Sequence, residues 1–323
     1  MRYLFAAIFM LCLLASPACA EKAAETVYVG AYVNDIQQIN LHEDSYRLDF
    51  YVWFRWKDAS LDPSRSAEFM NAFEPSGHVR THIYDKPQKL PDGSLYAVIR
   101  EQGQFSAKFP LQQYPFDKQE LVVAMEDTLH GEKEMVYVPD GKSPAPMSLS
   151  ARISMPGFDI GKPALAVGGF PYPTNFGDTT QPDSTAYSRA VFAIPIQRPS
   201  LGTGIKVFLP LLLVMACAAL VFFVHPAYVE GRLGVAITAL LTLVALQLTS
   251  ASNLPEVDYL LMTDKVYLLA YMFIIATMLQ VARISRLVHA QKFDEVRSSD
   301  RRALGICVAM LACGFGIIVW TTF

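Results

Sequence analysis

The chain has 323 residues, a formal net charge of −3 and a mean hydropathy of +0.26. This apolar balance excludes an ordinary soluble protein, and the slightly acidic charge argues against nucleic-acid binding. Residues 21–198 contain no cysteine, which excludes a disulfide framework in that part of the chain.

The first 20 residues, MRYLFAAIFMLCLLASPACA, have a basic start, an apolar centre and a small-residue end. This pattern is typical of a secretory signal peptide that is cleaved before Glu21. A lipid anchor on Cys19 is the alternative, which the residues before it fit poorly. Residues 21–198 are therefore expected outside the cytoplasm.

Residues 21–198 are predicted to form an all-β sandwich of the immunoglobulin-like type. Residues 46–57 are the clearest strand, because apolar side chains alternate with polar and aromatic ones. Further strands are predicted at 27–33, 95–101, 104–109, 120–126 and 188–196. A short helix near 63–73 is the one helical signal, and many short strands favour a sandwich.

Residues 199–323 contain four apolar stretches long enough to cross a membrane, at 205–224, 235–251, 260–281 and 304–321. Six Lys/Arg residues lie between 283 and 302, whereas the connection 253–265 is acidic. The positive-inside rule therefore predicts a cytoplasmic loop at 283–302. An exported sandwich and four crossings agree with this topology and return the C-terminus to the outside.

The second apolar stretch carries a line of residues spaced by three or four positions, which places them on one face of a helix. They are Glu230, Gly234, Thr238, Leu241, Ala245, Leu248 and Ser252. Polar residues on this face are unfavourable against lipid. Several copies packed around a water-filled pore would explain them, and polar contacts within a helix bundle are the alternative.

Several motifs follow one another in a recognisable order. Residues 109–119 read FPLQQYPFDKQ, with Tyr114, Pro115, Phe116 and Asp117 at its centre. Trp56-Lys57-Asp58, Arg198, Glu230-Gly231-Arg232 and Asn253-Leu254-Pro255 complete the set. Together they resemble the pentameric ligand-gated ion channel family over essentially the whole mature chain. Ala107 and Leu121 stand where animal receptors have their loop cysteines, so the loop disulfide is missing, as it is in prokaryotic members.

The resemblance implies a homopentameric, multi-pass channel gated by a small agonist or by protons. It implies the inner membrane of a bacterium, with the sandwich in the periplasm and lipid around the helices. Glu230 would form a ring that selects monovalent cations, since anion-selective relatives have Pro-Ala in place of Glu230-Gly231. Leu241 would form a hydrophobic gate, and Arg232 would point away from the pore axis. No cofactor and no metal are implied.

The resemblance also assigns coupling residues between the sandwich and the helices. Asp117 would pair with Arg198, and Pro115, Phe116 and Pro255 would pass motion of the sandwich to the second helix.

The resemblance further implies an agonist site built from aromatic residues: Tyr51, Tyr84, Phe170, Tyr172 and Phe176. The family's expected Trp is Thr128 here, which argues against a full aromatic cage for a quaternary amine. Protons, small amines and carboxylates stay open as agonists. Packing between subunits is an alternative role for these aromatic side chains.

Enzymatic activity finds no support, because the sequence has neither a Gly-rich phosphate loop nor a Gly-x-Ser-x-Gly motif. His78 and His82 are four residues apart, but nearby Pro and Gly disfavour a metal-binding helix, so both are predicted to be solvated. The competing function is a non-conducting membrane sensor, which the short predicted cytoplasmic loop disfavours.

Overall fold

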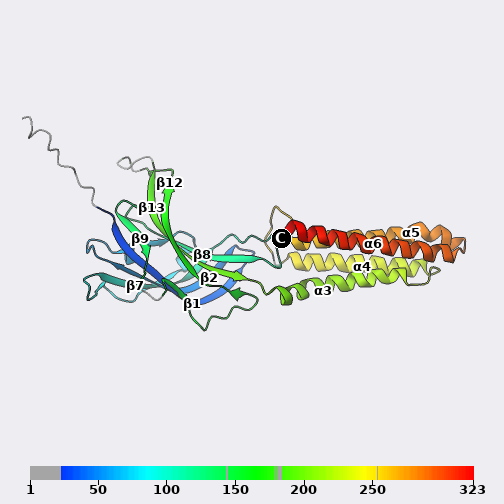
Figure 1. Ribbon diagram of the computed structural model, residues 1–323, viewed down its shortest axis with the longest axis horizontal. Coiled ribbons are helices and arrows are strands. Elements are labelled where there is room, and N and C mark those ends of the chain that lie inside the picture. Colours follow the sequence, from blue (N-terminus) through cyan, green and yellow to red (C-terminus); the bar gives the residue numbers. More distant parts are fainter. Residues whose placement is uncertain (1–22, 143–144, 178, 180–183, 253) are drawn as a thin grey trace, which may run out of the picture.

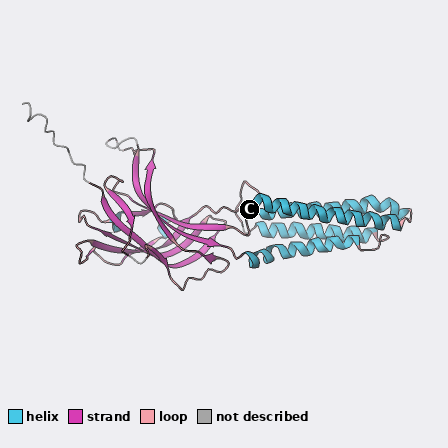
Figure 2. Ribbon diagram, in the orientation of Figure 1, coloured by secondary structure: helices cyan, strands magenta, loops and turns pink. Residues whose placement is uncertain are grey.

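The computed structural model describes residues 23–142, 145–177, 179, 184–252 and 254–323. The predicted signal peptide at 1–20 and Asn253 lie outside these residues. A β-sandwich comes first, and a bundle of long helices extends from one end of it (Figures 1 and 2). The C-terminus lies at the end of the bundle that faces the sandwich (Figure 1).

The sandwich consists of two sheets, which confirms the predicted fold class. One sheet contains β1 (Glu25–Asn40), β2 (Ser45–Trp56), β4 (Ala72–Phe73), β5 (Val79–His82), β6 (Gln88–Lys89), β7 (Leu95–Ser106), β9 (Met135–Pro139) and β10 (Met147–Leu149). The other contains β3 (Ala67–Phe69), β8 (Lys118–Asp127), β11 (Asp159–Ile160), β12 (Ala164–Tyr172) and β13 (Thr185–Gln197). The short helices α2 (Pro63–Ser66) and η1 (Pro75–Gly77) lie between strands.

The core of the sandwich follows from the alternation in β2. All six alternate side chains from Tyr46 to Trp56 are at most 2% exposed, because successive residues of a strand point to opposite faces. They pack with residues of β7, β8 and β13 between the two sheets. Burial of this much apolar surface is the main stabilising term of the domain.

Two strand predictions needed correction. Segments 95–101 and 104–109 belong to one strand, β7, because Gly103 stays in the ladder opposite Leu48. A side chain at Gly103 would collide with the His78 ring, so the glycine makes room for that ring and does not mark a turn. The helix predicted near 63–73 is limited to α2, and β3 and β4 follow it.

The bundle contains α3 (Ser200–Ala219), the short η2 (Leu220–Phe222), α4 (Val229–Ala251), α5 (Met262–His289) and α6 (Phe293–Thr322). Within the described residues, four helices are long and apolar enough to cross a membrane. The helices run past the apolar stretches, so the predicted loop 283–302 is helical except at residues 290–292. The charged residues there are mostly exposed on the helix surface, where water satisfies them without ending the helix.

Candidate functional site

The α4 helix has one exposed face and one buried face. All seven residues of the predicted line, from Glu230 to Ser252, are exposed in the single chain. Leu241 and Leu248 are 65% and 67% exposed, as much as apolar residues on the outer faces of the other helices. The buried residues of α4 are Arg232, Ala236, Ala239 and Leu243. The line is therefore the face that the other helices of the same chain leave uncovered.

Two hydroxyl groups on this part of α4 bond to the helix itself. Thr242 Oγ1 donates to the Thr238 carbonyl at 2.8 Å, and Ser252 Oγ donates to the Thr249 carbonyl at 2.9 Å. Such bonds to the preceding turn satisfy a hydroxyl without a partner helix. The Thr242 and Ser252 hydroxyls therefore do not link α4 to another helix, whereas the Ser250 hydroxyl bonds to Tyr267 of α5.

Arg232 lies on the opposite side of α4 from Glu230. Its side chain is fully buried, and its Nη2 lies 2.6 Å from Asp300 Oδ2 on α6. Its Nε donates to the Val221 carbonyl at 2.8 Å. Two residues along a helix correspond to a rotation of about 200°, so an exposed Glu230 and a buried Arg232 are mutually consistent.

The loop 109–119 presents a buried carboxylate at the boundary between sandwich and bundle. Arg198 Nε lies 2.9 Å from Asp117 Oδ1, and Gln119 Nε2 donates to Asp117 Oδ2 at 2.7 Å. The Arg198 guanidinium also lies over the rings of Tyr114 and Phe158, at 5.2 and 4.5 Å from their centroids. Asp117 is 1% exposed, so the contact is a buried ion pair flanked by aromatic rings.

The same loop contacts three helices of the bundle. Phe116, which follows Pro115, places its ring 6.0 Å from Phe208 of α3 and 6.3 Å from the C-terminal Phe323. The Met262 amide at the start of α5 donates to the Gln112 carbonyl at 3.1 Å. A displacement of this loop would therefore act directly on α3, α5 and the end of α6.

The connection between α4 and α5 is packed into the sandwich. Leu254 and Leu261 are buried members of the sandwich core, and Tyr259 packs against it. His42, in the turn between β1 and β2, places its Nδ1 3.4 Å from the Leu254 carbonyl oxygen. Pro255, in the same connection, is half-buried.

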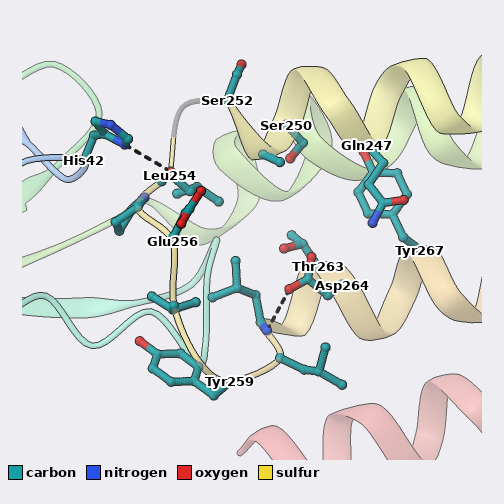
Figure 3. A pocket seen from close by; sticks show the side chains of 15 residues that line it. His42, Gln247, Ser250, Ser252, Leu254, Glu256, Tyr259, Thr263, Asp264 and Tyr267 are labelled. Carbon is teal, nitrogen blue, oxygen red and sulfur yellow. Dashed lines mark hydrogen bonds between the residues drawn. The ribbon is translucent and has the colours of Figure 1, made fainter.

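A pocket of about 500 Å³ lies at this connection. Figure 3 shows it bordered by His42 on one side and by the ends of α4 and α5 on the other. Ser252, the last residue of the exposed α4 line, is part of its lining. The pocket therefore joins the sandwich turn to the end of the candidate pore face.

Three of the five candidate agonist-site residues lie together. The Tyr172 ring is 5.0 Å from Phe170 and 5.3 Å from Phe176. A cation from the chain itself occupies this cluster, because Arg189 Cζ lies 3.3 Å from the Phe170 centroid. Arg189 Nε donates to Glu126 Oε1 at 2.5 Å.

The phenol of Tyr172 completes this cluster. Its hydroxyl donates to Glu126 Oε2 at 3.0 Å and accepts from Arg189 Nη2 at 2.9 Å. Burial and, second, the bond to Glu126 raise the pKa of Tyr172. Sequence reasoning missed Glu126 and Arg189 as members of this site. The available signal was that each is a charged residue on a predicted strand, 120–126 and 188–196.

Tyr51 belongs to the other sheet and Tyr84 lies in the loop after β5, so neither joins this cluster within one chain. Tyr51 lies on β2 beside Arg100, with 5.5 Å from Arg100 Cζ to the ring centroid. Tyr84 pairs with Tyr96 at 6.3 Å between centroids. The five aromatic residues could therefore line one site only if two chains contribute to it.

The prediction that His78 is solvated is wrong. Its Nδ1 lies 2.9 Å from Glu101 Oε1 and its Nε2 lies 2.7 Å from the Gln104 carbonyl oxygen. The ring fits the space over Gly103 and packs against Phe105. Among the described residues, no group of three or more His, Cys, Asp or Glu side chains is arranged to hold a metal.

Comparison with known proteins places these features in context. No protein-family model matches the chain. It is 24% identical over 303 residues to the serotonin-gated chloride channel of Caenorhabditis elegans, covering 85% of this chain and 58% of that protein. It is 20% identical over 295 residues to the proton-gated ion channel of Gloeobacter violaceus, covering 87% of this chain and 77% of that protein.

A third similarity is to the glutamate-gated chloride channel subunit beta of Haemonchus contortus, 21% identical over 212 residues. The match covers 66% of this chain and 47% of that subunit. The chain is a relative of the pentameric ligand-gated ion channels. It spans little more than half the length of the Caenorhabditis elegans relative.

Similarity to these channels agrees with the architecture, a β-sandwich followed by four helices long and apolar enough to cross a membrane, and supports a multi-pass membrane protein. These relatives are ion channels and not enzymes. Two of the three are named as chloride channels, so relationship alone leaves the sign of the permeant ion open. The sign has to be argued from the residues of this chain.

Proposed function

We propose that this protein is a ligand-gated, cation-selective channel formed by five copies of the chain in the inner membrane of a bacterium. The observation that carries the proposal is the uncovered line on α4, from Glu230 through Thr238 and Leu241 to Ser252. Five such faces around one axis would enclose water and give the polar residues a favourable environment. The sandwich would lie in the periplasm.

Cation selectivity is proposed from the two charges at the start of α4. Glu230 is exposed on the line, so five copies would form a ring of carboxylates at the cytoplasmic mouth. The nearby cation, Arg232, is buried and paired with Asp300, so it does not offset this ring. Negative charge at a narrow mouth attracts cations and repels anions.

A gate is proposed at Leu241, in the middle of the line. A ring of leucines of this exposure would close the pore by excluding water, and Ala245 and Leu248 would extend the apolar section. Leu241→Thr should then leave the closed channel leaky, measured as current without agonist. An unchanged closed state would place the gate elsewhere.

Opening is proposed to start at the β12–β13 hairpin, where Phe170, Tyr172 and Phe176 meet Arg189. The Arg189 guanidinium already covers the face of Phe170, which disfavours a quaternary amine as agonist. Protons, small amines and carboxylates are the agonist classes to test. Motion would reach α4 through Pro115, Phe116, the Asp117–Arg198 pair and the connection that contains Pro255.

The decisive experiment is current through planar bilayers that contain only the purified full-length protein. Screening pH, small amines, amino acids and divalent ions should identify conditions that open it. Under a KCl gradient the reversal potential should lie near that of K⁺, and Glu230→Ala should move it toward zero. Glu295→Gln, which removes an exposed carboxylate of α6, is the matched control.

Each outcome separates the alternatives. Absence of current under every condition would support a non-conducting sensor. A reversal potential near that of chloride in the wild-type protein would reject cation selectivity while keeping the channel. An unchanged potential in Glu230→Ala would remove the carboxylate ring as its cause.

A further inference from the structure

The cytoplasmic end of the bundle contains a buried charge pair that the channel proposal does not use. Arg232 is completely buried, and its partner Asp300 is 4% exposed. Buried ion pairs need additional hydrogen bonds to offset the loss of hydration. Here Gln280 of α5 donates to Asp300 Oδ1 at 3.2 Å, and η2 supplies the Val221 carbonyl to Arg232. One cluster thus joins the α3–η2 segment, α4, α5 and α6.

The cluster leaves part of the Arg232 guanidinium without a hydrogen bond. The Nη1 atom of Arg232 is buried and has no hydrogen-bond partner among the described residues. Asp300 is the one carboxylate within ion-pair distance of this guanidinium in the described part of the chain. If that charge were removed, nothing else in the described surroundings would neutralise Arg232.

The position of Arg232 makes its orientation matter for conduction. It lies only two residues from Glu230, whose side chain is on the exposed face of α4. A long, flexible arginine without a counterion gains hydration by turning toward the nearest water. The water at this end of α4 includes the mouth proposed for the pore, and a cation released into that mouth would offset the Glu230 carboxylate.

We infer that Asp300 is a positioning residue for ion selectivity: it holds the Arg232 cation inside the bundle and so leaves the Glu230 ring with its full negative charge. This inference rests on the proposed cation channel. It assigns a role in selectivity to a residue on α6, the helix farthest along the chain from the pore-lining sequence. The charge preference of the mouth thus depends on a contact between residues 68 positions apart.

The test uses full-length protein in planar bilayers under a KCl gradient, with assembly checked by size-exclusion chromatography. Asp300→Asn should lower the cation-to-anion permeability ratio by roughly two- to threefold or more, because unpaired cations reach the mouth. Arg232→Gln and the double variant Arg232→Gln/Asp300→Asn should both keep the wild-type ratio. Glu295→Gln, on an exposed part of the same helix, should also leave it unchanged.

Two results would overturn the inference. One is an assembled Asp300→Asn channel with an unchanged reversal potential. The other is an increased permeability ratio in Arg232→Gln, which would mean that Arg232 already faces the pore in the wild-type protein. If Asp300→Asn fails to assemble, Arg232→Gln decides: an unchanged permeability ratio supports a cation held away from the mouth, and an increased ratio overturns the inference. A wild-type channel without cation selectivity would instead reject the proposed function.

Discussion

Buried pairs of arginine and carboxylate make the long-range connections of this molecule. Arg198–Asp117 joins the sandwich to the first helix, Arg232–Asp300 joins two helices, and Arg189–Glu126 joins two strands of one sheet. In each pair the side chain of the acidic residue is at most 5% exposed. Removing one partner of such a pair leaves an uncompensated charge, so these residues should be sensitive to substitution.

The first prediction concerns the Asp117–Arg198 pair. Asp117→Asn should lower the free energy of unfolding by about 3 kcal/mol, because the half-buried Arg198 loses its counterion. The exchange Asp117→Arg/Arg198→Asp should recover only part of the agonist response. Tyr114 and Phe158 favour a cation at position 198, and Gln119 favours an anion at position 117.

Thermal unfolding of the purified protein and agonist dose–response curves measure the two effects. If the double exchange behaves no better than the worse single variant in both measurements, direct pairing does not drive the coupling between sandwich and bundle.

The second prediction concerns pH. The bidentate bond from Arg100 is the largest effect on the pKa of Asp49 and lowers it. Burial raises this pKa, but the further bond from Asn34 helps to keep it below its ordinary value. A lowered pKa in the folded state stabilises the protein above the unfolded-state pKa of about 3.9, and this contribution is lost as the pH falls further. Asp49→Asn should therefore be less stable than wild type at pH 7.

The deficit of Asp49→Asn should shrink as the pH falls below about 4, which urea unfolding at several pH values would measure. Glu43→Gln, at an exposed position, serves as the control. A deficit that stays constant with pH would show that the substitution acts through packing and not through the charge.

Among the elements, β2 and α4 follow most directly from sequence. Both carry a strict local period, two in the strand and about 3.6 in the helix, and a local period survives in any fold that buries one face. Strand β7 and the segment 283–302 were harder to predict from sequence. A glycine such as Gly103 is typical of a turn, and a cluster of charged residues is typical of a loop. Their outcome depends on neighbours, a histidine ring in one case and an exposed helix surface in the other.

The third prediction tests the two faces of α4 with one residue type. Ala245→Cys lies on the exposed line and Ala236→Cys on the buried face. A charged, water-soluble thiol reagent should modify the first and block current, and it should leave the second unmodified. Lipid around the exposed face would protect both positions equally, which would contradict a water-filled pore.

At the scale of the whole molecule, the order of the domains could be predicted but the pairing of distant side chains could not. Hydropathy, the signal-like start and the motif order indicate a sandwich followed by four helices. The partners of Arg232, Arg189 and His78 are 68, 63 and up to 26 residues away. No local pattern identifies such partners, because only the folded topology brings them together.

The fourth prediction follows from the uncovered α4 line and from the split of the aromatic residues between two sheets. Native mass spectrometry of detergent-solubilised protein should show five copies. Tyr51 of one copy should then approach Tyr172 of another, so cysteines at these positions should form an intermolecular disulfide under oxidation. A monomer, or a complex in which those cysteines never link, would contradict this arrangement.

The α4–α5 connection places Leu254 and Leu261 in the core of the sandwich. The sandwich core therefore includes residues from beyond the predicted domain boundary at residue 198. A sandwich expressed alone would lack these two core side chains and would expose the apolar surface that they cover. It should therefore aggregate and be poorly soluble. The same two leucines matter when the helices are fused to a different sandwich. A foreign sandwich grafted onto these helices should be accepted only if the strip from 254 to 261 is exchanged with it.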